Sequence, residues 1–92
     1  MFSFSAKQEE QRLIDGLKAG SAAAWREAMT LYGGAMLSIA RNFSPHHADD
    51  ITQEAWISAY NGMERFEGRA SLKTWLIRIV MNCAYSYLRR KN

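Results

Sequence analysis

Apolar residues recur every three or four positions along most of this chain, and this period limits the fold more than any other feature. It is clearest in residues 22–42, where Trp25, Tyr32 and Ile39 fall on one side of a helix. Nowhere do apolar and polar residues alternate long enough to predict a β-strand. The 92 residues suffice for one core and one domain. We therefore predict an all-α fold, a compact bundle of about four helices.

Gly20 and Ser21 separate the first two predicted helices. The first covers residues 8–19 and ends at the glycine, and the serine can cap the second, which covers residues 22–42. Before the first helix we expect a flexible tail at residues 1–7, so that the folded domain comprises residues 8–92.

Two adjacent glycines, Gly33 and Gly34, lie in the middle of the second predicted helix. Each costs a helix about 1 kcal/mol relative to alanine. We therefore expect another helix to pack closely against them, or a kink there. A break into two helices is the alternative.

Ser44 and Pro45 predict the start of a third helix, because serine can cap and proline suits the first helical position. This helix should run to about Met63. A loop follows at residues 64–70, where the period is lost. Ser71 can then cap a fourth helix that extends to residue 91.

Charged residues are segregated along the chain. The net charge is +1 over residues 1–43, −4 over residues 44–68 and +6 over residues 69–92, and the last segment contains no acidic residue. Such segregation implies two opposite faces and a polyanionic partner for the basic one.

The fourth helix should carry cations, hydroxyl groups and an amide on its outward side. Cations neutralise phosphates, an amide can read a base edge, and a tyrosine ring can stack on an unpaired base. The candidate DNA-binding residues on this helix are Lys73, Thr74, Arg78, Asn82, Tyr85 and Arg89. A solvated basic face that balances the helix dipole is the alternative. The absence of acidic residues after position 68 favours DNA.

Acidic and polar residues face outward at the start of the third helix: Asp49, Asp50, Gln53 and Glu54. They could dock a protein, bind a metal or form an ordinary solvated turn. We do not expect a metal site, because the adjacent His46 and His47 point about 100° apart and only one could join these carboxylates.

The sequence contains no recognisable catalytic arrangement, such as a glycine-rich phosphate loop or a nucleophile with an evident base. We therefore predict that the protein is not an enzyme and needs no cofactor. The single cysteine, Cys83, falls on the apolar side of the fourth helix and suits a reducing compartment. No apolar run is long enough for a signal peptide or a membrane span, so we expect a cytoplasmic location and no membrane contact.

Two long motifs and a short terminal one occur in a recognisable order. They are DDITQEAWISAY at residues 49–60, RFEGRASLKTWLIRIVMNCA at residues 65–84 and YLRR at residues 87–90. With these motifs in this order, the chain resembles region 2 of bacterial sigma factors of the extracytoplasmic-function class over nearly its whole length.

The resemblance implies a role in transcription initiation for both charged faces. The third helix would dock on the clamp helices of the RNA polymerase β′ subunit through Asp49, Asp50, Gln53, Glu54 and Ile57. The loop with Phe66 and Arg69, together with the fourth helix, would open the promoter minus-ten element and hold its non-template strand. One flipped base would be read with the help of Asn82. Anti-sigma proteins commonly occupy the same surfaces in this family, so such a protein is a further candidate partner.

The family also uses region 4, a second helical domain that binds the minus-thirty-five element, and this chain ends at Asn92 without it. We therefore do not expect full promoter-selective initiation from these residues alone. The alternative function is that of a helical interaction module whose basic face binds an acidic protein and not DNA.

Overall fold

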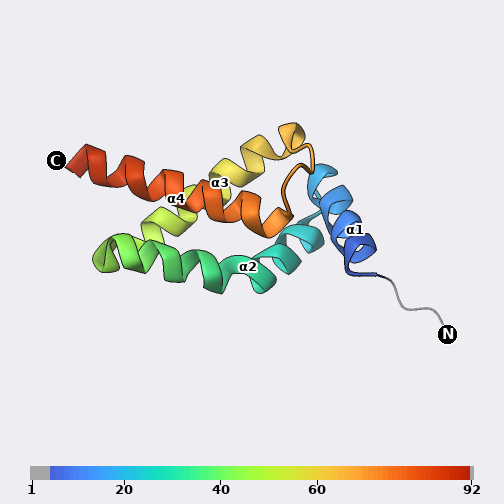
Figure 1. Cartoon of the computed structure of the whole chain (residues 1–92), viewed down its shortest axis with the longest axis horizontal. Coiled ribbons are helices and arrows are strands. Elements are labelled where there is room, and N and C mark those ends of the chain that lie inside the picture. The colour runs from blue at the N-terminus through green and yellow to red at the C-terminus, as the bar shows by residue number, and fades with distance from the viewer. Residues whose placement is uncertain (1–4, 92) are drawn as a thin grey trace.

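The computed structural model describes residues 5–91, which form four α-helices and two short 3-10 helices (Figure 1). In chain order these are α1 (Ala6–Lys18), α2 (Ala22–Phe43), η1 (Pro45–His47), α3 (Ala48–Gly62), η2 (Met63–Arg65) and α4 (Leu72–Lys91). The described residues contain no strand, and the all-α prediction is confirmed.

Helix α1 begins earlier than the sequence indicated. Ser5 caps it: its hydroxyl accepts the Gln8 N–H at 3.2 Å, and the Gln8 side chain accepts the Ser5 N–H at 3.0 Å. This reciprocal capping box satisfies two backbone donors at the helix start. The expected tail at residues 1–7 is therefore wrong for Ala6 and Lys7, which are helical, and residues 1–4 lie outside the described part.

Serine caps also begin α2 and α4, as predicted. The Ser21 hydroxyl accepts the Ala24 N–H at 3.2 Å, and the Ser71 hydroxyl accepts the Thr74 N–H at 3.1 Å. Gly20 precedes α2 with a φ of 76°, a left-handed conformation that glycine adopts without strain.

Helix α2 continues without a break through Gly33 and Gly34. A Cβ atom placed on either glycine would meet nothing within 4 Å. The expected close packing of another helix is therefore wrong, and so is the alternative of two separate helices. The helix bears the cost of both glycines without a packing contact that would explain them.

The third helix starts later than predicted. Ser44 closes α2, with its N–H bonded to the Ala40 carbonyl at 2.9 Å, and its hydroxyl bonds to His47 Nδ1 at 3.1 Å instead of capping a backbone N–H. Pro45 begins the separate turn η1, and α3 follows from Ala48.

The core lies where α2, α3 and α4 pack against one another, and α1 lies across one end, against α2 and η2 (Figure 1). Alanines such as Ala28, Ala55 and Ala84 are fully buried and let the helices approach closely. Met36, Ile51, Leu72, Leu76 and Val80 fill the space between the helices. The predicted apolar sides of the third and fourth helices are thus confirmed as buried. The outward sides of α3 and α4 remain available for partners.

Candidate nucleic-acid interface and docking surface

One side of α4 presents five of the predicted DNA-binding residues to solvent, and we refer to it as the α4 face. Its members are Thr74, Arg78, Asn82, Tyr85 and Arg89, all exposed. At about 100° per residue they fall within a sector of about 80° around the helix axis. Lys73 is also exposed, but it lies about 140° around the axis from Arg78. We therefore do not count Lys73 in the α4 face.

The polar groups of the α4 face differ in how far they are already engaged. Arg89 donates to the Ser86 hydroxyl at 3.2 Å, and the Tyr85 ring packs edge-on against Phe43 with ring centres 4.9 Å apart. Among the side chains that the structure describes, none bonds to the Asn82 amide or pairs with Arg78. These two groups can therefore bind a ligand without giving up an internal contact.

The segment between η2 and α4, loop 66–71, corrects the prediction for Phe66. The family resemblance implied that Phe66 contacts DNA, but Phe66 is only 5% exposed and its ring centre lies 5.0 Å from that of Trp75. Burial of an aromatic ring stabilises the fold. Phe66 therefore anchors the loop and does not offer a free stacking surface.

The middle of loop 66–71 is exposed. Gly68 has a φ of 77°, which turns the chain, and Arg69 pairs with Glu67 at 3.3 Å. Both side chains of this pair are largely solvated, so it contributes little to stability and leaves Arg69 free to exchange partners. A hollow of about 150 Å³ lies between the loop and the start of α4, bordered by Trp75 and Arg78.

Two residues of α1 that the sequence did not single out hold this loop. The Lys18 ammonium group donates to the Phe66 carbonyl at 2.7 Å, and the Glu10 carboxylate accepts the Leu72 N–H at 3.2 Å. Their partners lie 48 and 62 positions away, so no local sequence signal could have revealed these contacts.

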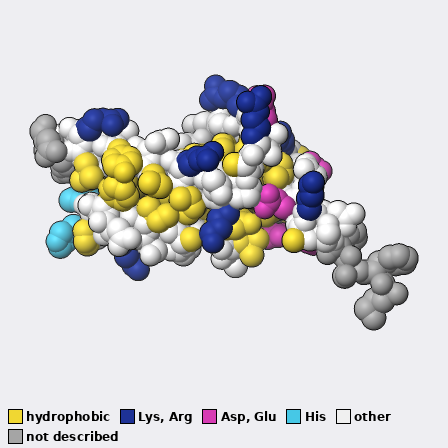
Figure 2. All heavy atoms as spheres, in the orientation of Figure 1, with side chains coloured by type: hydrophobic (Ala, Val, Ile, Leu, Met, Phe, Trp, Pro, Cys, Tyr) yellow, Lys and Arg dark blue, Asp and Glu magenta, His cyan; other side chains and the backbone are white. Residues whose placement is uncertain are grey.

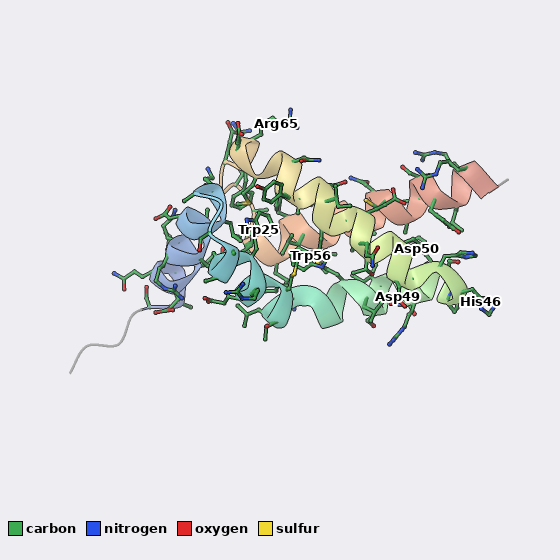
Figure 3. All side chains as sticks on the ribbon, turned by 180° about the vertical axis from the view of Figure 1, so that it is seen from behind. Trp25, His46, Asp49, Asp50, Trp56 and Arg65 are labelled. Carbon is green, nitrogen blue, oxygen red and sulfur yellow. The ribbon has the colours of Figure 1, made fainter. Side chains whose placement is uncertain are left out.

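The predicted polymerase-binding residues lie along the outward side of α3, and we refer to them as the α3 surface. Asp49, Asp50, Gln53 and Ile57 are exposed, and Glu54 is partly buried. Asp49 and Asp50 occupy the first turn, where the helix dipole favours negative charge (Figure 3). Glu54 pairs with Arg90 of α4 at 3.1 Å, so the acidic and basic faces meet there.

An apolar hollow of about 520 Å³ continues the α3 surface toward the start of α2. Trp25 and Trp56 meet edge-on inside it, with ring centres 6.4 Å apart, and Figure 3 shows them between the two helices. Exposed Met29 and Tyr60 line its rim. The sequence did not predict the hollow, because its shape depends on how α2 and α3 pack.

The charge distribution separates these two regions. On the side where α4 lies in front, Figure 2 shows Lys and Arg side chains over much of the molecule, with acidic side chains toward the end where α1 lies. It also shows hydrophobic side chains exposed on this side, between α2 and α4. A single nucleic-acid strand would complement this side, because its phosphates are negative and the ring faces of its bases can stack on apolar side chains.

Other candidate chemistry finds no support in residues 5–91. They contain no group of three His, Cys, Asp or Glu side chains that could hold a metal ion. Burial raises the pKa of the Cys83 thiol, with Ser58 as its neighbour at 3.8 Å, and this keeps the thiol protonated. No helix among these residues is both long and apolar enough to cross a membrane.

The family model described as Sigma-70 region 2 matches residues 28–92. The ECF RNA polymerase sigma-E factor of Escherichia coli (strain K12) is 31% identical over 85 residues, covering 91% of this chain and 44% of that protein. The RNA polymerase sigma-H factor of Pseudomonas aeruginosa is 30% identical over 84 residues, covering 89% and 44%. The chain thus spans less than half the length of these relatives.

One solved structure is similar over almost the entire chain. It is the NMR structure of the complex formed by an engineered region 2 of sigmaE with GTAAAA. The match has a TM-score of 0.83 at 28% identity and covers 96% of this chain and 94% of that one.

Proposed function

Because this chain belongs to the Sigma-70 region 2 family, we propose that it binds RNA polymerase through the α3 surface and captures unpaired promoter minus-ten DNA through loop 66–71 and the α4 face. The family consists of transcription factors and not of enzymes. The observation that carries the DNA-binding role is the exposed pair of Arg78 and Asn82, one turn apart on the α4 face and without side-chain partners among the described residues. Arg78 also lines the hollow at loop 66–71.

Each group of the α4 face has a task in holding a single strand. Arg78 and Arg89 neutralise phosphates, and Asn82 offers both a donor and an acceptor to the edge of a flipped base. Tyr85, about half exposed, offers a ring on which a base can stack. Phe66 acts indirectly, since its buried ring fixes the loop, while Arg69 at the exposed tip reaches the backbone of the strand.

The α3 surface combines charge with apolar area. Asp49, Asp50 and Gln53 attract a basic partner, and exposed Ile57 leads into the apolar hollow. A helix with basic and apolar side chains would satisfy both parts, which agrees with the clamp helices of the β′ subunit that the family resemblance implies. An anti-sigma protein that binds the same surface would compete with RNA polymerase for it. This role places the protein in the cytoplasm and needs no cofactor.

Binding to a labelled single-stranded GTAAAA oligonucleotide tests the DNA part of the proposal. We expect tighter binding than to a scrambled oligonucleotide of the same composition, and an affinity that falls with added salt. Equal binding to both oligonucleotides would contradict base reading. Binding to neither would favour the alternative of a module for acidic proteins. A pull-down with core polymerase tests the protein part separately.

A further inference from the structure

Helix α1 contacts loop 66–71 at both of its ends. At the first end, the Lys18 Nζ lies 2.7 Å from the Phe66 carbonyl oxygen. At the second end, Glu10 Oε2 lies 3.2 Å from the N of Leu72, the first residue of α4. Both contacts are partly shielded from solvent.

Each contact satisfies a backbone group that the loop or α4 leaves without a local partner. The Leu72 N–H belongs to the first turn of α4, where a helix supplies no acceptor of its own, and a carboxylate there also suits the helix dipole. The Phe66 carbonyl lies just after η2 and receives a charged donor, which makes a short and strong hydrogen bond.

Helix α1 is rigid enough to act as a brace. Leu13, Ile14 and Leu17 fix it in the core. Glu10 and Lys18 are eight residues apart, about 12 Å along the helix, so the two contacts hold well-separated points of the neighbouring segment. A small hollow of about 70 Å³ is lined by Ile14 of α1 and by Gly68, so α1 also lies beside the first half of the loop.

Between its two ends the loop has little support of its own. Glu67, Gly68 and Arg69 are exposed, and the single ion pair among them is solvated. The path of the loop, and with it the shape of the hollow beside Arg78, therefore depends on how the two ends are held. The Phe66 ring and the Ser71 cap hold the ends locally, and the two contacts from α1 add support from a separate helix.

We propose that Lys18 and Glu10 are positioning residues that set the shape of loop 66–71 and thereby its selectivity for bases. This inference rests on the proposed DNA-binding function and extends it to a helix that lies outside residues 28–92, the part matched by the family model. Neither residue needs to touch DNA.

Paired substitutions separate positioning from stability and charge. Lys18→Met removes the donor but keeps the apolar stem, and Lys18→Arg retains a donor. Glu10→Leu removes the acceptor, and Glu10→Gln retains one. Lys7→Met, at the exposed start of α1, controls for the loss of a positive charge on the same helix. For each protein we would measure the dissociation constant for a variant oligonucleotide with one base changed, divided by the dissociation constant for GTAAAA.

We expect this ratio to fall about fivefold or more in Lys18→Met and Glu10→Leu, within the discrimination that a base contact supplies. Lys18→Arg, Glu10→Gln and Lys7→Met should retain it. Affinity for a scrambled oligonucleotide should change little. A lower melting temperature with an unchanged ratio would overturn the proposal, because it would assign the two residues to stability alone. If Lys18→Met does not fold, the two Glu10 variants test the proposal; if Glu10→Leu does not fold, the two Lys18 variants do.

Amide hydrogen exchange at Leu72 gives a readout that does not depend on DNA. Exchange should accelerate in Glu10→Leu and return to the original rate in Glu10→Gln. If the unaltered protein does not distinguish the oligonucleotides, the proposed function fails, and this exchange test alone decides whether α1 braces the loop. Equal exchange rates in both variants would refute the brace.

Discussion

The outward sides of α3 and α4 belong to neighbouring helices but are built for different ligands. The α3 surface is acidic at one end and continues into an apolar hollow formed with α2. The α4 face is mostly polar, and its Arg78 and Asn82 have no side-chain partners within the described residues. An ion pair between Glu54 and Arg90 joins the two sides.

This difference predicts different responses to substitution. A hollow with an apolar rim suits a protein partner, whose binding depends on a few buried side chains and fails when one of them is removed. A row of separate polar groups suits a strand, and each group contributes its own increment of affinity or selectivity. The α3 surface should therefore respond almost all-or-none, and the α4 face in graded steps.

The largest effect is expected for Ile57→Arg. Ile57 is 61% exposed, so the free domain should keep its stability, but a cation in the apolar part of the α3 surface would repel a basic partner. We expect a loss of at least about 100-fold in affinity for core polymerase, close to 2.7 kcal/mol. Leu31→Arg is the matched control, since Leu31 is 57% exposed on α2 and lies outside this surface. Equal losses in the two variants would remove the contrast between the surfaces.

Asn82→Ala should have an intermediate effect and act on selectivity. Loss of an amide that reads a base edge should weaken binding to GTAAAA by about 1 to 3 kcal/mol and relax the preference at one position only. Asn61→Ala removes another exposed amide, from α3, and should leave DNA binding unchanged. If Asn82→Ala weakens all oligonucleotides alike, Asn82 does not read a base.

The period of the sequence correctly predicted which sides of α3 and α4 face outward. Such placement follows from local geometry, since every third or fourth residue returns to the same side of a helix. Asp50 and Asn82 could therefore be assigned to surfaces without a structure. The same geometry could also have separated Lys73 from Arg78.

Features that depend on tertiary packing were not predictable in this way. The ring of Phe66 is buried because Trp75 lies beside it, and the loop is fixed by Lys18 from a helix far away in the sequence. The hollow at Trp25 likewise depends on the packing of α2 against α3. A loop sequence with glycine and mixed charge indicates exposure on average and does not reveal which of its side chains turns inward.

Arg78→Ala should produce a smaller effect than Asn82→Ala on the preferred sequence, and the same effect on every sequence. We expect the salt dependence of binding to flatten by about 0.7 when one phosphate is no longer neutralised, the value for single strands. Lys73→Ala removes the same charge from the same helix outside the α4 face and should change the slope less. If both variants change the slope equally, DNA binding depends on the net charge of α4 and not on the arrangement of residues in the α4 face.

The smallest effect is expected for substitutions at Gly33 and Gly34, which test whether the α3 surface and the α4 face act independently. Helix α2 contributes Trp25 to the hollow beside α3 and Phe43 to the contact with Tyr85 on α4, with Gly33 and Gly34 between them. Because a Cβ atom on either glycine meets no neighbour, replacing either by alanine should raise the free energy of unfolding by about 0.5 to 1 kcal/mol.

Gly16→Ala is the contrasting control for this measurement in chemical denaturation. There the new Cβ would lie 2.8 Å from the Cβ of Ala24, and the domain should be destabilised. If α2 only holds the two regions apart, Gly33→Ala and Gly34→Ala will leave polymerase binding and DNA binding unchanged while the domain becomes more stable. A change in either affinity would show that α2 couples the α3 surface to the α4 face. The two glycines would then make α2 flexible between the two partner sites, and the free energy of unfolding of the free domain would be lower for it.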